Sequence, residues 1–482
     1  MKLAKTMRWA AIVAGFPILL AGETFANSIA VTNVGLSWKN ETLKAANVVF
    51  DLSWSNSWRS GEQRDAAWVF VKFRAPGSND WQHATLSTNN ADHRAGGSST
   101  ISAVSDGKGV FMYSSAGYTG NVNYVQTKLQ WNYGSNGYNF AKGDLVEVSV
   151  HAIEMVYIPE CAFTLGSGGS EAGHFYQFPA TSQPYLVTSE TNAIMVGMTN
   201  GYLYYDNYGD KAGVISNAFP KGFAAFYCMK YEVSQGQYAE FLNKLTTAQA
   251  STRYVVASTY RYTITKDISN YYSASAPDRA CSLLGWAHGI AYADWAALRP
   301  MTELEFEKAC RGPGNPVPNE YAWGTTSITQ LTAEAGTAGS GTETVSAAAG
   351  ANCNYGNGGV GGPTRAGIFA ATNATRTTSS RQLSGAGYYG VMELSGNLWE
   401  RLVTVGTASG RAFRGTLGDG VLDVNGNATG NSDWPASSGM RGGNWSWEGP
   451  VTYARVSDRI YAIFDPGSDC HYSLGRCVRQ SP

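Results

Sequence analysis

Seven cysteines and six histidines are the residues of this sequence best suited to redox, nucleophilic or metal chemistry. The cysteines form no CxxC pair and the histidines no HxxxH or HExxH pair, which disfavours zinc and histidine-metal sites. A GxSxG nucleophile elbow and a Walker loop are also absent from the sequence. The cysteines are Cys161, Cys228, Cys281, Cys310, Cys353, Cys470 and Cys477, and the histidines are His83, His93, His151, His174, His288 and His471.

Three carboxylates, Glu303, Glu305 and Glu307, could in principle act as paired acid and base. Thr302 and Glu305 have the spacing of a capping box, which places the three glutamates in the first turns of a helix. We therefore interpret them as helix capping and surface charge. No residue is predicted to be catalytic.

Aromatic side chains are dense near the C-terminus, where they could form a partly polar binding patch. Aromatic rings supply a large contact area at a low cost in side-chain entropy, which suits protein or sugar ligands. The alternative is that about half of them belong to a core. The candidate ligand-binding residues are Asn444, Trp445, Trp447, Tyr453, Tyr461, Phe464, His471 and Tyr472.

The N-terminus indicates export. Lys2, Lys5 and Arg8 precede an apolar run at residues 9–21, and residues 24–26 offer a cleavage site with a small final residue. The run is short for a membrane span, although an uncut anchor is the alternative. We expect residues 1–26 to be a signal peptide and the mature chain to be periplasmic, cell-surface or secreted, without a transmembrane segment. Because such compartments are oxidising, we also expect one to three disulfides.

Composition limits the possible partners. Only 15% of the 482 residues are charged and the formal net charge is −1, so no basic surface for nucleic acid is expected. Glycine (56), tyrosine (28) and tryptophan (14) are abundant. This balance favours a loop-rich fold with aromatic surfaces.

Residues 27–150 are predicted to be all-β. Short β-branched and aromatic runs at residues 48–54, 67–73, 124–131 and 145–150 are separated by polar turns. Strands at this spacing predict a sandwich similar to immunoglobulin or fibronectin domains.

Residues 151–482 form the second predicted domain. Ser234 and Gln237 make a capping box before the apolar positions of a first helix, residues 286–298 favour another, and a third opens at Thr302. Residues 329–362 are rich in Gly, Thr, Ser and Ala, which predicts an irregular loop.

Several motifs recur in order along this second domain. They are residues 155–159 (MVYIP), 230–235 (KYEVSQ), 298–307 (LRPMTELEFE), 321–324 (YAWG), 390–400 (GVMELSGNLWE), 441–443 (RGG) and 475–479 (GRCVR). Together they resemble the formylglycine-generating enzyme, or sulfatase-modifying factor, family. The resemblance implies an α+β domain with the C-type-lectin-like fold of that family and much ordered loop.

The resemblance also implies specific sites. Family enzymes that oxidise a sulfatase cysteine carry two cysteines after the Arg-Gly-Gly turn, near Trp447 and Val451 or Thr452 here, yet no cysteine lies between Cys353 and Cys470. Copper is therefore not expected. Structural Ca²⁺ is implied at Glu393, Gly396, Leu398 and Glu400, and a second ion at Asn352 and Cys353. The alternative for Glu400 is an ion pair with Arg401 or Arg441.

These observations favour an exported, non-catalytic binding or adhesion protein of bacterial type, with a protein or glycan ligand at the cell surface. One alternative is an oxidoreductase-type enzyme of the same superfamily with altered chemistry. Another is a variable ligand-binding protein of a diversity-generating retroelement, because residues 444–473 lie where such proteins diversify.

Overall fold

The computed structural model describes residues 29–482 except 142, 207, 347–349, 374–379, 430–431, 447–449 and 465–472. The predicted signal peptide, at residues 1–26, lies outside this part of the chain. No helix among the described residues is long and apolar enough to cross a membrane.

Strands dominate the N-terminal third of the chain, as predicted. They are β1 (Ala30–Asn40), β2 (Ala45–Ser60), β3 (Gln63–Arg74), β4 (Gln82–His83), β5 (Ser99–Ala103), β6 (Val110–Ser114), β7 (Thr119–Trp131) and β8 (Glu147–Ile158), with a 3-10 turn at Asn90–Asp92. β2 pairs with β1 on one side and with β7 on the other, and β3 pairs with β6 and β8. Side chains from both groups share one hydrophobic cluster. The immunoglobulin-like topology of this part stays a prediction.

The rest of the chain combines short strands with six described α-helices. The helices are α1 (Gln235–Leu242), α2 (Thr247–Arg253), α3 (Trp286–Trp295), α4 (Glu303–Arg311), α5 (Ile368–Asn373) and α6 (Ala408–Arg411), with a 3-10 turn at Val451–Ala454. The strands are β9 (Phe163–Leu165), β10 (Tyr176–Gln177), β11 (Tyr185–Val187), β12 (Ile194–Val196), β13 (Leu203–Tyr204), β14 (Gly213–Ile215), β15 (Phe226–Met229), β16 (Ile264–Lys266), β17 (Tyr272–Ala274), β18 (Arg299–Pro300), β19 (Glu334–Ala335), β20 (Thr344–Val345), β21 (Trp399–Leu402), β22 (Gly439–Arg441), β23 (Ser473–Gly475) and β24 (Cys477–Gln480).

Local signals account for the helix starts. Both predicted capping boxes are present, from Ser234 to Gln237 and from Thr302 to Glu305, and Thr246 with Gln249 makes another. α3 ends at Trp295, three residues before the predicted end. In the described residues of the segment predicted as irregular, the strands are limited to the short pair β19–β20.

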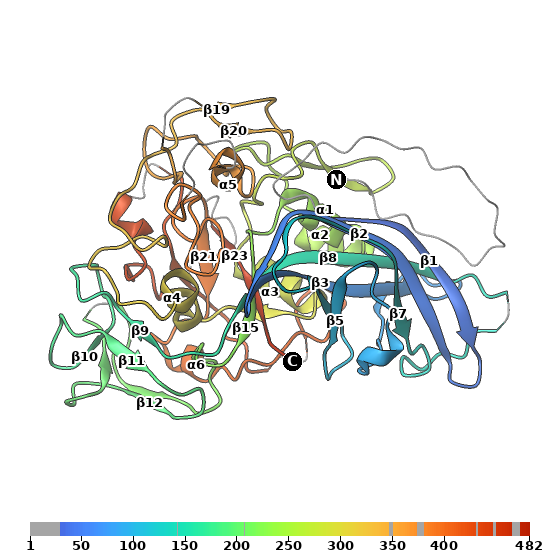
Figure 1. The fold of residues 1–482 in the computed structure, drawn as a ribbon, viewed down its shortest axis with the longest axis horizontal. Helices are drawn as coiled ribbons and strands as arrows, with labels where there is room; N and C mark the ends of the chain where they lie inside the picture. The colour runs from blue at the N-terminus through green and yellow to red at the C-terminus, as the bar shows by residue number, and fades with distance from the viewer. Residues whose placement is uncertain are drawn as a thin grey trace.

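One continuous sheet joins the two parts of the chain. Its strand order is β1-β2-β3-β8-β15-β24-β18, so N-terminal strands lead directly into the strands that carry the C-terminal end (Figure 1). The boundary expected after residue 150 falls inside β8, which pairs with β3 along its N-terminal part and with β15 at its end. A strand shared in this way couples the two parts mechanically.

β3 is buried on both faces, and this explains the coupling. Side chains alternate across a strand, so Val69 and Val71 enter the N-terminal cluster while Trp68 and Phe70 pack with α1 and α3. The Trp68 indole also donates a hydrogen bond to the Ala296 carbonyl (2.9 Å).

A buried ion triad lies at the same junction. Lys230 Nζ is 3.3 Å from Asp65 in β3 and 3.2 Å from Glu154 in β8. Asp65 also accepts hydrogen bonds from the Trp54 indole and the Ser57 hydroxyl. Burial raises the pKa of Glu154 to about 7, against the opposing effect of Lys230.

Replacing Lys230 with methionine should destabilise the whole chain, because two buried carboxylates lose their cation. We expect Lys230→Met to lower the free energy of unfolding by about 3–5 kcal/mol, measured by urea denaturation. The exposed Lys266→Met is the control, and Lys230→Met/Glu154→Gln should recover part of the loss. An unchanged unfolding midpoint in Lys230→Met would contradict this role.

Candidate functional site

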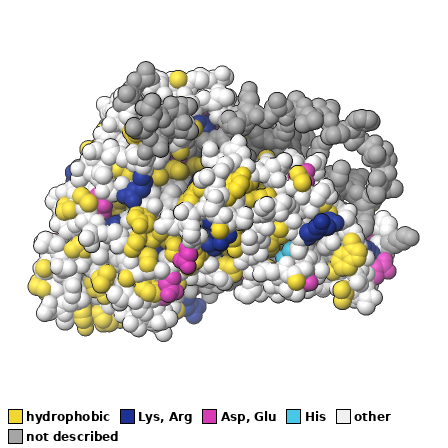
Figure 2. Space-filling model, in the orientation of Figure 1, with side chains coloured by type: hydrophobic (Ala, Val, Ile, Leu, Met, Phe, Trp, Pro, Cys, Tyr) yellow, Lys and Arg dark blue, Asp and Glu magenta, His cyan; other side chains and the backbone are white. Residues whose placement is uncertain are grey.

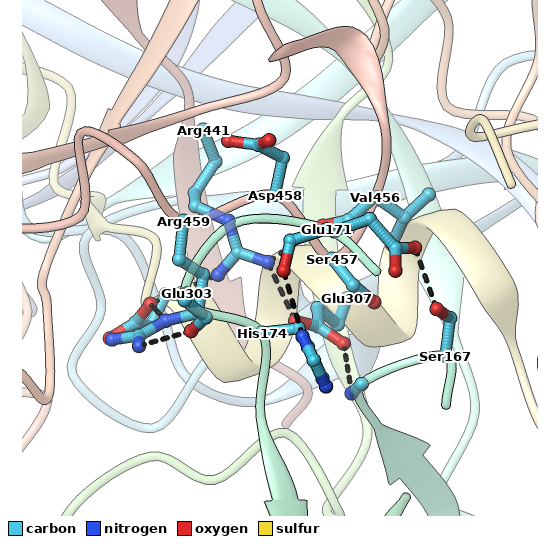
Figure 3. Close-up of polar contacts among 12 residues, drawn as sticks. Ser167, Glu171, His174, Glu303, Glu307, Arg441, Val456, Ser457, Asp458 and Arg459 are labelled. Carbon is cyan, nitrogen blue, oxygen red and sulfur yellow. Dashed lines mark hydrogen bonds and ion pairs between the residues drawn. The ribbon is translucent and has the colours of Figure 1, made fainter. Parts of the chain in front are cut away.

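A fully buried network of glutamates and arginines lies beneath the Arg-Gly-Gly turn (Figure 3). Glu303, at the start of α4, accepts hydrogen bonds from Arg459 Nε (2.8 Å) and Arg441 Nη1 (2.9 Å). Glu307, one turn later, accepts from Arg441 Nη2 (2.6 Å) and from Arg311 Nη1 (2.9 Å). Arg441 thus bridges two positions of α4.

The arginines keep these glutamates ionised. Burial by itself would raise the pKa of Glu303, but Arg459 and Arg441 outweigh it and hold this pKa below its usual value. The pKa of Glu307 is likewise held below its usual value, by Arg441 and Arg311. A carboxyl group whose pKa is lower in the folded than in the unfolded chain stabilises the fold at pH values above its unfolded-state pKa. This stabilisation is lost as the pH falls through the pKa of the folded state.

The interpretation of these glutamates as surface charge was wrong. Glu303, Glu305 and Glu307 are all buried, and Glu305 pairs with Arg299 (2.6 Å) besides capping α4. The physical reason is that Arg441 and Arg459 lie more than 130 residues further along the chain. Nothing in the local sequence of α4 reveals such partners. The low share of charged residues, together with arginines inside the motifs, was the available signal.

The Glu393–Glu400 turn is also held from outside its own sequence. Glu232 accepts a hydrogen bond from the Leu398 amide (3.1 Å) and another from the Asn397 side chain. Glu400 pairs with Arg476 Nε (2.5 Å), and not with Arg401 or Arg441 as the alternative had it. Sequence reasoning assigned no role to Glu232 or Arg476.

The first predicted calcium position brings together three buried carboxylates, those of Glu232, Glu393 and Glu400. Burial is the main cause that raises the pKa of Glu232 and that of Glu393, the latter to about 7. Glu393 and Glu400 raise the pKa of Glu232 further, and Glu400 raises that of Glu393. One oxygen of Glu393 and one of Glu400 have no hydrogen-bond partner in the part of the chain that the structure describes. Arg476 is the cation in closest contact with this group.

The second predicted calcium position has fewer oxygens available to an ion. The Asn352 side-chain oxygen accepts a hydrogen bond from the Thr329 amide (2.8 Å), and the Cys353 carbonyl accepts one from the Leu331 amide (2.8 Å). Protein groups therefore already use the oxygens that an ion would need. Within the described residues, no three side chains of His, Cys, Asp or Glu form a cluster able to hold a metal.

The structure gathers three of the predicted ligand-binding residues. Tyr453 and Tyr461 pack against the buried Trp399 ring (5.9 and 5.3 Å between centroids), and Phe464 packs against Tyr461 (5.1 Å). Tyr453 and Tyr461 are half-buried and Phe464 is 46% exposed. We call Tyr453, Tyr461 and Phe464 the aromatic face.

Two further predicted ligand-binding residues are buried instead of joining the aromatic face. Asn444 and Trp445 are buried, and the Trp445 amide donates to the Asn397 carbonyl (2.9 Å), which ties this segment to the Glu393–Glu400 turn. The Trp445 ring lies 5.4 Å from that of Tyr260. Trp447, His471 and Tyr472 fall outside the described residues. On the side of the molecule in Figure 2, hydrophobic side chains form several separate patches among few charged ones.

Six of the seven cysteines are described, and all six are free thiols. For these six the expectation of disulfides was wrong: Cys228, Cys310 and Cys353 share one hydrophobic cluster and Cys281 and Cys477 another, yet none of the six is bridged. Five of them are buried, and burial raises their pKa, to about 12 for Cys228. Cys161 alone among the six is partly exposed, with its sulfur 3.3 Å from the Tyr389 hydroxyl.

Buried thiols with a raised pKa should be unreactive in the folded protein, because the thiolate is the nucleophile. In Cys161→Ser/Cys470→Ser, we expect no rapid reaction with a chromogenic disulfide reagent at pH 8. The five buried thiols should then react together once guanidinium unfolds the chain. Rapid labelling of any of them in the folded state would contradict their assignment as inert core residues.

Comparison with known protein families agrees with the geometry. The model of the sulfatase-modifying factor enzyme 1-like domain matches residues 183–462. No curated protein matches the sequence. The match includes α4, the Glu393–Glu400 turn, Arg441, Tyr453 and Tyr461, and it spans more than half of the chain. The chain therefore belongs to the family of proteins with a sulfatase-modifying factor enzyme 1-like domain.

Proposed function

We propose that this protein is an exported, non-catalytic binding protein that uses the aromatic face to hold a protein or glycan ligand. The observation that carries the proposal is the position of this face. It follows the Arg441-Gly442-Gly443 turn, where the enzymes that the sequence resembles keep a pair of thiols. Here the resemblance places the second thiol at Val451 or Thr452, directly before Tyr453, and the sequence has no cysteine between Cys353 and Cys470.

The aromatic face is suited to binding because its support is rigid. Trp399 is 1% exposed and belongs to β21, which pairs with β22 on one side and β23 on the other. Glu400 and Arg441 are opposite each other in that pairing, so the face is continuous with the buried ion network. Rings held in one position lose little further entropy when a ligand covers them.

In this proposal the N-terminal β structure is rigidly attached to the domain that binds the ligand. An immunoglobulin-like spacer on a flexible linker would move independently of the domain that it carries. Here the shared sheet and the Lys230 triad fix the two parts together. We infer that the ligand meets one body outside the cytoplasm.

A structural calcium ion is the second element of the proposal. Glu393 and Glu400 would each supply an oxygen that now has no partner, and the Gly396 and Leu398 carbonyls could complete a set of hard oxygens. A divalent cation would also offset the mutual repulsion among the three carboxylates. Its contribution would be to stabilise the turn beneath the binding segment.

Calcium and Glu393→Gln should have opposite effects on stability. At pH 8, millimolar Ca²⁺ should raise the melting temperature of the wild-type protein by several degrees, measured by calorimetry. Glu393→Gln should melt higher than wild type without calcium, because a buried charge is removed, and it should lose the response to calcium. No shift with Ca²⁺ in the wild type would contradict the calcium proposal.

If the aromatic face holds the ligand, a substitution within it should weaken binding and an equally exposed substitution elsewhere should not. On arrays of immobilised glycans and of extracellular proteins, the wild type should bind a restricted set, and Phe464→Ala should weaken that binding at least tenfold. Tyr271→Ala is the matched control, because this ring has a similar exposure of 39% outside the aromatic face. Equal binding by Phe464→Ala and wild type, with folding intact, would contradict the assignment of the face.

A further inference from the structure

A cleft of about 540 Å³ opens between the N-terminal β structure and the family domain, away from the aromatic face. Trp81 and Lys108 line it from the N-terminal side, and Lys244 and Leu422 line it from the other. Beneath the cleft, Lys72 Nζ links the two sides by donating a hydrogen bond to the Gly420 carbonyl (3.0 Å). The volume lies within the range that small-molecule sites occupy.

Two ammonium groups in the cleft have no acidic partner. Lys244 Nζ lies 4.1 Å from the centroid of the Trp81 ring, and this cation–π contact positions it on the cleft wall. Among the described residues, neither Lys108 nor Lys244 forms an ion pair, although ion pairs engage many other cations of this chain. Asp80, which is exposed, is the one acidic side chain of the lining.

Lys244 is partly withdrawn from water as well. Burial lowers the pKa of its ammonium to about 8, and Glu240 offsets that effect only in part. The Trp81 ring and the attraction of Glu240 and Glu147 compensate only part of the water that this charge has lost. An anion in the cleft would therefore stabilise Lys244 in its charged form.

The remaining walls combine apolar side chains with neutral polar ones such as Gln82 and Asn136. Trp295 forms part of the cleft and is 4% exposed, packed at its base against Phe70. Leu245, Leu422 and Val424 line the opening. Apolar walls with a few convergent polar groups characterise sites for small organic ligands, and the polar groups here include two lysines.

We propose that this cleft is a second binding site, for a small organic carboxylate with an aromatic or similarly apolar body. The ring lies between Trp81, Leu422 and Trp295, and the carboxylate meets Lys244 and Lys108. Because each side of the cleft supplies one of the two lysines, the site exists only when both parts of the chain are docked. It is independent of the aromatic face, so either site can be tested without the other.

Matched acids and amides test the proposal on the full mature chain. We would measure by calorimetry the affinities for phenylacetate, indole-3-acetate and naphthalene-1-acetate, each beside its uncharged amide. At least one acid should bind at least tenfold more tightly than its amide. In Lys108→Met/Lys244→Met the acid should bind only as tightly as the amide, while the amide affinity stays unchanged.

Controls separate this outcome from general charge effects. Lys266→Met, which removes an exposed lysine outside the cleft, should keep the preference for the acid. Trp81→Ala should weaken the amide, because an apolar wall is lost, and should weaken the acid at least as much, because the contact that positions Lys244 is lost as well. The proposal would be overturned if none of the three acids bound with a millimolar or tighter dissociation constant, or if each acid bound only as tightly as its amide. It would also be overturned if the preference for the acid survived in Lys108→Met/Lys244→Met.

Discussion

The pairing of Glu303 and Glu307 with Arg441 is the interaction on which the rest of the family domain depends. Buried charges are costly unless each is paired and hydrogen-bonded, and here Arg459 and Arg311 complete the pairing. The network fixes α4 against the Arg-Gly-Gly turn, and β22 passes that constraint to β21. A domain with little regular structure thereby acquires a rigid centre, over which loops can differ in chemistry without loss of the fold.

A second constraint makes the N-terminal β structure part of this centre. β3 has one core on each face, so it cannot leave the family domain without exposing Trp68 and Phe70 to water. Burial of such side chains is worth about 1.5–3 kcal/mol each. The cleft exists because of this docking, and the aromatic face lies on the body that the docking stabilises. Two chemically different surfaces therefore share one scaffold.

The sequence was sufficient where the determining signals are local. Capping boxes at Ser234 and Thr302 located α1 and α4, and alternating apolar residues located β2, β3 and β7. The ordered motifs identified the family. The sequence was insufficient where the residues that contact one another lie far apart along the chain.

The buried network shows this limit, because the roles of Glu303 and Glu307 depend on arginines more than 130 residues away. The aromatic segment shows it as well, since residue type alone could not separate Trp445, which is buried, from Phe464, which is exposed. Burial is a property of the assembled fold, and periodicity reveals it only within regular helices and strands.

The central claim is that the scaffold functions here without thiol oxidation, and a turnover measurement tests it most directly. A cysteine peptide of the Cys-Thr-Pro-Ser-Arg type would be incubated with the full mature protein, copper and oxygen, and followed by mass spectrometry. The account predicts that the peptide cysteine stays unconverted beyond the level of a copper-only control. Formylglycine that accumulates in proportion to protein concentration would contradict it.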